Sequence, residues 1–227
     1  EALDIPVMHD DQQGTAIVVL AGVMNALKVV GKKLAIARIV ISGAGAAGTA
    51  TAKLLYAAGA RDIILLDRKG IVDETRSESH KKELAKITNS RKVKGDLREA
   101  LTGADVLIGV SGPALATAAD IALMNKKAIV FALANPTPEI LPDEAKKGGA
   151  VVIATGRSDF PNQINNALVF PGLFRGALDS GVSKITEEIT LRAAKALAAL
   201  VPKPTADKII PDLLDPRVAE AIAKSVR

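Results

Sequence analysis

The chain has 227 residues, a formal net charge of +5 at neutral pH, 48% hydrophobic residues and 24% charged residues. A chain of this length can bury a sizeable core, and its apolar fraction and nearly balanced charge exclude intrinsic disorder. Because there are no cysteines, disulfides, zinc ribbons and a thiol nucleophile are excluded as well. Aromatic residues make up only 2%, which argues against a platform that stacks the bases of single-stranded nucleic acid.

The sequence does not predict a membrane segment or a leader. The most apolar run, residues 16–27, is shorter than the roughly 20 residues that a bilayer requires. The chain does not begin with methionine, and no basic-then-apolar pattern precedes Asp4. We therefore expect a cytoplasmic protein, and we expect these residues to be one segment of a longer polypeptide.

The hydrophobic pattern predicts the elements in chain order, beginning with an almost wholly apolar helix over residues 14–33. Short runs rich in valine and isoleucine then predict buried strands over 38–42, 62–66, 105–110, 128–133 and 151–154. Helical stretches alternate with them, over 46–58, 77–88, 97–102, 114–125 and 142–147. After Pro171, helices are predicted over 184–200, with Ser183 as the N-cap, and over 216–226.

Strands and helices in alternation predict an α/β fold, a Rossmann-like, doubly wound parallel sheet with right-handed crossovers. The two ends of the chain do not follow this alternation and add extra flanking helices. We expect residues 1–227 to form one domain, with a core over about 36–170 and helical flanks over 12–33 and 171–227.

A glycine-rich turn between the first predicted strand and its helix fits the pattern G-x-G-x-x-G, with Gly43, Ala44, Gly45, Ala46, Ala47 and Gly48. The first glycine permits the tight turn, the second lets backbone approach a pyrophosphate, and the third lets the helix pack closely on the strand. The helix N-terminus supplies free N–H groups to the anion. The alternative is a purely structural turn, but Asp67 follows at the end of the next strand, where a carboxylate can bind an adenosine ribose.

The residues around Asp67 bear on the choice of cofactor. The carboxylate favours NAD, because it would repel a 2′-phosphate. Arg68 and Lys69 follow it directly and could receive that phosphate, so NADP stays possible.

Two later strands end in small or polar residues that could form the rim of a ligand crevice. Ser111 and Gly112 follow the strand over 105–110, and Asn135 follows the strand over 128–133. Ligands of open parallel sheets bind beyond the carboxyl ends of the strands. Ordinary loop punctuation by glycine and proline is the alternative.

Paired aspartates and paired asparagines are the remaining candidates. Asp10 and Asp11 precede the first helix, where they could cap it or bind Mg²⁺ or Mn²⁺. Asn165 and Asn166 lie among apolar residues, so their amides need partners, either within a loop or in a substrate carboxylate. His80 is expected on a solvated helix face.

These segments together resemble the cofactor-binding half of malic enzymes over nearly the whole chain: residues 3–16, the glycine turn, and residues 67–70, 134–137 and 165–172. The resemblance implies oxidative decarboxylation of malate to pyruvate and CO₂, with reduction of NAD or NADP and a divalent metal, Mg²⁺ or Mn²⁺. It implies that Asp11 is a metal ligand and that Asp10 belongs to the catalytic machinery by tuning a lysine. It places residues 44–47 at the pyrophosphate, and Asn135 and Asn166 at nicotinamide ribose and malate.

The resemblance also implies missing parts. Malic enzymes use a general-base lysine, a general-acid tyrosine and a further acidic metal pair, all upstream of the paired aspartates. Tyr56, the sole tyrosine, follows the glycine turn and is expected to pack. We therefore expect an N-terminal catalytic domain of the same polypeptide as a partner, a homodimer, and little activity from this segment alone.

Two other classes share some of these features. Amino-acid and shikimate-type dehydrogenases have the glycine turn and a similar sheet, but they need no paired-aspartate metal segment. A non-catalytic NAD-sensing module would bind the dinucleotide without a substrate pocket at Asn135 and Asn166. Nucleic-acid binding is disfavoured, because the charge of +5 is modest and the lysines are scattered.

Overall fold

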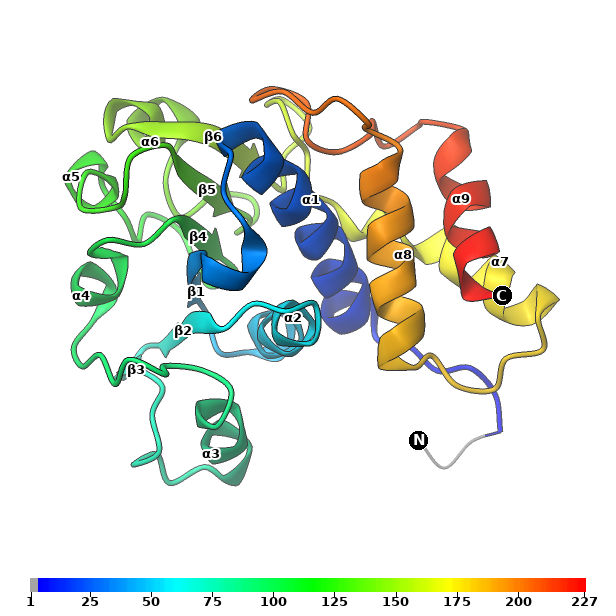
Figure 1. Cartoon of the computed structure of the whole chain (residues 1–227), viewed down its shortest axis with the longest axis horizontal. Helices are drawn as coiled ribbons and strands as arrows, with labels where there is room; N and C mark the ends of the chain where they lie inside the picture. Colours follow the sequence, from blue (N-terminus) through cyan, green and yellow to red (C-terminus); the bar gives the residue numbers. More distant parts are fainter. Residues whose placement is uncertain (1–3) are drawn as a thin grey trace.

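The structure is a computed structural model and describes residues 4–227. At its centre lies a six-stranded sheet in the order β3-β2-β1-β4-β5-β6 (Figure 1). The strands are β1 (Arg38–Ser42), β2 (Asp62–Asp67), β3 (Gly70–Ile71), β4 (Val106–Gly109), β5 (Ala128–Ala132) and β6 (Ala150–Thr155). All neighbouring pairs are parallel except β2 with β3. The predicted Rossmann-like α/β fold is confirmed.

Helices cover both faces of the sheet and extend beyond it at both ends of the chain (Figure 1). In chain order they are η1 (Asp10–Gly14), α1 (Thr15–Val30), η2 (Leu34–Ile36), α2 (Ala46–Ala57), α3 (Ser79–Ala85), α4 (Leu97–Leu101), α5 (Ala118–Ile121), α6 (Pro142–Lys147), η3 (Asn166–Leu168), α7 (Phe170–Asp179), α8 (Glu187–Ala199) and α9 (Arg217–Val226). Here η1 is a π-helical turn that continues into α1, whereas η2 and η3 are 3-10 turns.

Successive residues of the inner strands point into two separate hydrophobic cores. Ile39 and Ile41 of β1 belong to the core that includes α1, α2 and α8, whereas Val40 belongs to the core beneath α4, α5 and α6. Because both faces are covered, β4 and β5 are buried along their whole length. This explains why the strands appear as continuous apolar runs in the sequence.

The expectation that no apolar segment is long enough to span a membrane is wrong for the first helical segment. Residues Asp10–Val30 form 21 helical residues with a mean hydropathy of 1.6, which is long and apolar enough to cross a membrane. However, 72% of the apolar 18-residue window within this segment is buried inside the fold, where α1 packs on α2 and α8. The apolar surface of α1 is therefore used as core.

One polar residue lies within that buried helix. Asn25 is fully buried, and its side-chain amide donates to the carbonyl oxygens of Ala198 and Ile209, both at 2.9 Å. Its own Oδ1 accepts from Lys28 at 3.0 Å. Asn25 thus joins α1 to the end of α8 and to the C-terminal segment that follows it.

Several elements differ from the prediction. The helix predicted over 114–125 is reduced to α5, because the N–H groups of Ala114 and Ala116 bond to the loop before α6. Helix α8 starts later than predicted, since Thr186 is its N-cap and accepts from the Ile189 N–H, so the assignment of Ser183 is wrong. The short antiparallel strand β3 and helix α7 were not predicted as elements.

Replacing Asn25 with alanine should lower the free energy of unfolding by about 1–3 kcal/mol, because two buried carbonyl groups lose their donor. Chemical denaturation followed by circular dichroism measures this loss. Lys195→Ala, at an exposed position on α8, is the control and should change stability by less than about 0.5 kcal/mol. A loss that small for Asn25→Ala would contradict the proposed role of the amide.

Candidate functional site

The candidate site lies where the strand order reverses, between β1 and β4. From β1 the sheet continues to β2 on one side and to β4 on the other. The loops that follow β1 and β4 therefore diverge and leave a crevice between them. The two loops stay in contact at their bases, since the Val110 N–H donates to the Ser42 carbonyl at 2.9 Å. The hydroxyl groups of Ser42 and Ser111 are 3.3 Å apart.

The glycine turn forms the floor of this crevice. A Cβ atom at Gly48 would lie 1.7 Å from the Gly43 carbonyl oxygen, so only glycine lets α2 pack this closely on the end of β1. Gly43 itself has a φ of +124°, a conformation that favours glycine. Gly45, by contrast, faces open space and caps α2 without a side-chain hydrogen bond, which leaves the first N–H groups of the helix available to an anion.

Two of the cavities that adjoin the turn share Val110 and Ser111. The first, here called the edge cleft, has a volume of about 650 Å³ and is lined by Gly43, Ala44, Gly45, Asp67 and Ser111 among others. The second, here called the switch-point cleft, has a volume of about 450 Å³, and its lining includes Asp11, Ala47, Ser111, Gly112, Asn135 and Asn166. Most of the predicted site residues are therefore brought together, with Gly48 and Asp10 just behind the surface.

At the edge cleft, Asp67 is held by partners that the sequence did not reveal. Its carboxylate accepts from Lys81 at 2.6 Å, from Arg76 at 2.9 Å and from the Lys69 N–H at 2.8 Å. Burial raises the pKa of Asp67, but these hydrogen bonds outweigh that effect and hold the pKa below its usual value of 3.8. Asp67 is therefore ionised but closely neutralised by two cations.

Behind the switch-point cleft, Asp10 and Asn166 form a pair across 156 positions of sequence. The Asn166 amide donates to Asp10 Oδ2 at 2.7 Å, while Oδ1 is buried and has no hydrogen-bond partner in the described part of the chain. Burial and the neighbouring Asp11 carboxylate raise the pKa of Asp10. The alternative that these carboxylates cap the helix is not observed, because the N-cap residue of η1 is His9 and no side-chain cap bond is formed there. Asp10 and Asp11 instead lie in the first turn.

The paired asparagines have different environments. Asn165 caps η3, because its side chain accepts from the Ala167 N–H at 2.9 Å, which is the structural alternative considered above. Asn166 instead contacts Asp10 and borders the switch-point cleft. Asn135 is exposed at the rim of the same cleft.

The described residues fit a divalent metal only in part. Asp11 is exposed and lines the switch-point cleft, so its carboxylate is accessible to a cation. Among residues 4–227, however, no group of three or more His, Asp or Glu side chains is close enough to hold a metal. One protein carboxylate supplemented by substrate, water and further ligands is the arrangement that these residues permit.

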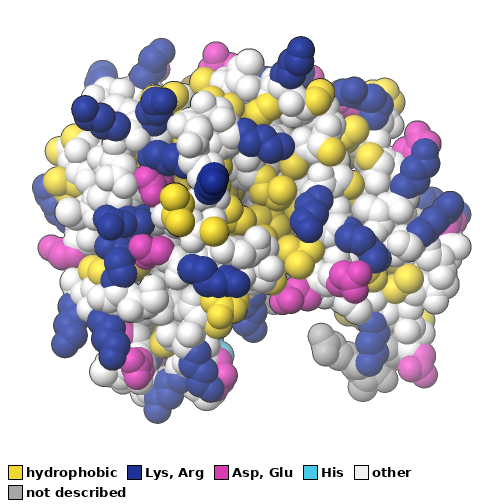
Figure 2. Space-filling model, in the orientation of Figure 1, with side chains coloured by type: hydrophobic (Ala, Val, Ile, Leu, Met, Phe, Trp, Pro, Cys, Tyr) yellow, Lys and Arg dark blue, Asp and Glu magenta, His cyan; other side chains and the backbone are white. Residues whose placement is uncertain are grey.

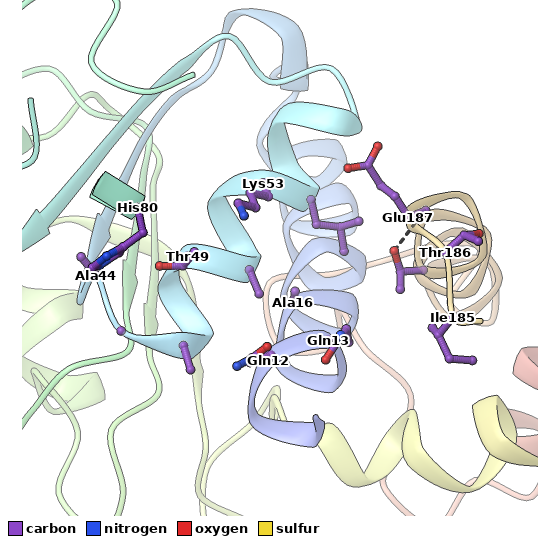
Figure 3. Close-up of a pocket in the computed structure, with 15 residues that line it drawn as sticks. Gln12, Gln13, Ala16, Ala44, Thr49, Lys53, His80, Ile185, Thr186 and Glu187 are labelled. Atoms are coloured by element: carbon purple, nitrogen blue, oxygen red, sulfur yellow. Dashed lines mark hydrogen bonds between the residues drawn. The ribbon is translucent and has the colours of Figure 1, made fainter. Parts of the chain in front are cut away.

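A third cavity, of about 620 Å³, lies between α2 and α8 (Figure 3). Gln12 and Gln13 enter it from the turn before α1, Lys53 extends from α2, and Glu187 faces them from α8. His80 is exposed, as expected, and lies beside Ala44 at its edge. Figure 2 shows hydrophobic side chains gathered in the hollow over α1, α2 and α8, with Lys and Arg side chains around it.

Tyr56 is remote from both clefts. It lies ten residues along α2 from Ala46, a distance of about 15 Å on a helix. Arg61 packs over its ring, with the guanidinium carbon 4.6 Å from the centroid. Tyr56 is 37% exposed, so the expectation that it packs in the fold is wrong apart from the contact with Arg61.

A Rossmann-like sheet with a glycine turn at its switch point and an acidic residue after β2 defines a dinucleotide-binding domain of the oxidoreductase type. Residues 12–227 match the family model described as the malic enzyme NAD-binding domain. The chain therefore belongs to the malic enzyme family and comprises its NAD-binding domain.

Individual relatives agree with this assignment. The chain is 50% identical over 228 residues to the bifunctional malic/malolactic enzyme of Bacillus subtilis, covering 98% of this chain and 56% of that protein. It is 50% identical over 230 residues to the NAD-dependent malic enzyme of Geobacillus stearothermophilus, covering 100% and 48%. The crystal structure of an NAD-dependent malic enzyme from Thermotoga maritima has a TM-score of 0.95 at 44% identity, covering 99% and 60%. The chain thus spans about half the length of the curated relatives it matches.

The ion pairs of Asp67 predict how stability responds to acid. A carboxyl group with a lowered pKa contributes stability above its unfolded pKa, and this contribution is lost as the pH falls through the folded pKa. Lys81→Met removes the closest cation, so the pKa of Asp67 should rise and the variant should begin to unfold at a higher pH than the wild type. Acid unfolding between about pH 5 and pH 2, followed by circular dichroism, measures the shift.

Lys82→Met, an exposed position on the same helix, is the matched control and should leave the acid-unfolding curve unchanged. Superimposable curves for Lys81→Met and the wild type would show that Lys81 does not hold the pKa of Asp67 down.

Proposed function

We propose that this domain is the cofactor-binding half of an NAD-dependent malic enzyme that converts malate to pyruvate and CO₂. The observation that carries the proposal is the packing of the Asp10–Asp11 turn against Asn166, at the cleft that also contains Asn135. This arrangement places carboxylates and amides next to the glycine turn, where a substrate and the reactive end of a dinucleotide would meet. A non-catalytic NAD sensor would not need it.

Each group then has a defined task. The N–H groups at the start of α2 bind the pyrophosphate beside Gly45, and Asp67 binds the adenosine ribose in the edge cleft. The nicotinamide half occupies the switch-point cleft, where Asn135 contacts its ribose and Asn166 contacts malate. Asp10 orients Asn166 through their hydrogen bond.

A divalent metal, Mg²⁺ or Mn²⁺, would be held by Asp11 together with ligands from outside the described residues. When bound, NAD supplies a hydride acceptor and the metal supplies an electron sink for decarboxylation. The residues of this chain bind and orient the cofactor and the substrate, and they keep Asp10 and Asn166 in fixed positions relative to Asp11.

The remaining machinery is proposed to come from the part of the relatives that this chain does not span. A general base and a general acid each contribute about 10²–10⁴-fold to such reactions, so residues 1–227 alone should turn over malate very slowly. We propose one domain with a core over about 36–170 and helical flanks, an N-terminal catalytic domain as its partner, and a homodimeric, cytoplasmic enzyme.

NAD is the proposed cofactor, with NADP as the second candidate. The ionised Asp67 disfavours a 2′-phosphate, and two relatives described above carry NAD in their names. The neutralisation of Asp67 by Arg76 and Lys81, with Arg68 also lining the edge cleft, weakens that repulsion and supports NADP as the alternative.

Replacing Asp67 with alanine should reduce NAD affinity by about tenfold or more, since a hydrogen bond to a charged group contributes about 1.5–3 kcal/mol. Titration calorimetry with NAD and with NADP on the same preparations measures both affinities. NADP affinity should fall less, because Arg68, Lys69 and Lys81 remain. The melting temperature should show that the variant is folded.

The control for this measurement is Asp212→Ala, because the Asp212 side chain is 82% exposed and, in the described part of the chain, forms an ion pair with Lys208 alone. It should bind NAD like the wild type. Unchanged NAD affinity in folded Asp67→Ala would remove Asp67 from the cofactor site.

In the complete polypeptide, Asp11→Asn should abolish metal-dependent malate turnover while NAD affinity stays unchanged, because the amide is a weaker ligand for a hard cation. Mn²⁺ binding, followed by electron paramagnetic resonance, should weaken in parallel. Asp4→Asn, an exposed position outside the cleft, is the control. Wild-type Mn²⁺ affinity and turnover in Asp11→Asn would refute the metal role.

A further inference from the structure

A buried carboxylate that none of the roles above uses lies beneath the switch-point cleft. Glu139 is only 2% exposed, and no Lys, Arg or His among residues 4–227 forms an ion pair with it. Its Oε1 accepts from the Ser111 N–H and its Oε2 accepts from the Ala134 N–H, both at 3.0 Å. Two backbone dipoles therefore compensate this charge.

Those two N–H groups belong to different loops. Ser111 follows β4 and Ala134 follows β5, and both residues line the switch-point cleft next to Gly112 and Asn135. One side chain thus bridges the ends of two neighbouring strands at the place where they border the cleft. Backbone bonds reinforce the bridge, from the Ala116 N–H to the Glu139 carbonyl at 3.2 Å and from the Ala114 N–H to the Pro138 carbonyl at 3.1 Å.

The last residue of β4 is adapted to this side chain. A Cβ atom at Gly109 would lie 2.4 Å from Cδ of Glu139 and 2.7 Å from its Cγ. The glutamate therefore occupies the space that a side chain on β4 would fill. This packing needs both a glycine at the end of β4 and a long acidic residue in the loop after β5.

The ionised form of Glu139 matters because its two oxygens each accept a hydrogen bond from a backbone N–H group. Burial raises the pKa of Glu139, while the N–H groups of Ser111 and Ala134 act in the opposite direction. A carboxylate presents two acceptors, whereas a glutamine amide presents one acceptor and one donor. The isosteric amide would therefore set its NH₂ group against one of the two N–H groups and release that loop.

We propose that Glu139 is a positioning residue for the dinucleotide: it fixes the loops at Ser111 and Ala134 in the shape that the nicotinamide half contacts. This inference rests on the proposed orientation of the cofactor, with its adenosine half in the edge cleft and its nicotinamide half in the switch-point cleft. Ser111 borders both clefts, whereas Ala134 and Asn135 line the switch-point cleft and not the edge cleft. The effect of Glu139 should therefore fall mainly on the nicotinamide half of the ligand.

The test compares Glu139→Gln with the wild type in the present chain, using NAD and 5′-ADP as separate probes in titration calorimetry. NAD affinity should fall at least about tenfold, while 5′-ADP affinity should change less than about twofold, since 5′-ADP lacks the nicotinamide half. Glu220→Gln, at an exposed glutamate on α9, is the matched control and should change neither. A merely structural role would lower both affinities together or leave both unchanged, and either result overturns the proposal.

Gly109→Ala provides a second route to the same answer if Glu139→Gln does not fold. The added methyl group displaces Glu139 from the opposite side without removing its charge, so NAD affinity should again fall more than 5′-ADP affinity. Equal changes for the two probes would overturn the positioning role. If the wild-type chain binds neither probe, the proposed function itself fails, whereas binding that responds to Asp67→Ala but not to these variants refutes only the role of Glu139.

Discussion

The site depends on the close approach of α2 to the end of β1. Since a Cβ atom at Gly48 would lie 1.7 Å from the Gly43 carbonyl oxygen, any larger residue would push the helix away from the strand. The N-terminus of α2 would then no longer point into the crevice between β1 and β4. The same helix packs on α1 and α8, so its position also sets that of η1, which carries Asp10 and Asp11. A single backbone contact thus relates the dinucleotide turn to the paired carboxylates.

Three carboxylates around the crevice are stabilised in three different ways. Within residues 4–227, Asp67 is neutralised by two cations, one Asp10 oxygen accepts from an amide while the other has no partner, and Glu139 accepts only from backbone N–H groups. The first arrangement lowers the pKa, whereas the other two leave it raised by burial. The differences follow from the neighbouring residues: Asp67, at the end of β2, lies within reach of Arg76 and Lys81, while the other two lie beneath the switch-point cleft.

Features that depend on a local sequence pattern were predicted, whereas contacts between residues distant in the sequence were not. The five parallel strands were predicted to within one residue at each end, because continuous apolar runs reflect burial on both faces. The glycine turn was predicted because its geometry requires particular residues. By contrast, the pairing of Asp10 with Asn166 spans 156 positions. The side-chain partners of Asp67 lie nine and fourteen residues away in sequence, Arg76 in the loop after β3 and Lys81 on α3. The truncation of the helix over 114–125 likewise depends on hydrogen bonds to residues 138 and 139.

The charge in the switch-point cleft bears on why the domain would need its other half. Its lining contains Asp11 and amides but no lysine or arginine among the described residues. Malate, the proposed substrate, carries two carboxylates, and placing them beside Asp11 without a compensating cation would be repulsive. A divalent ion at Asp11 would make the local charge positive and attract the substrate carboxylates. Basic groups from the rest of the polypeptide would neutralise the remaining negative charge. The acidic character of this cleft is therefore consistent with a site shared between a metal, a substrate and a second domain.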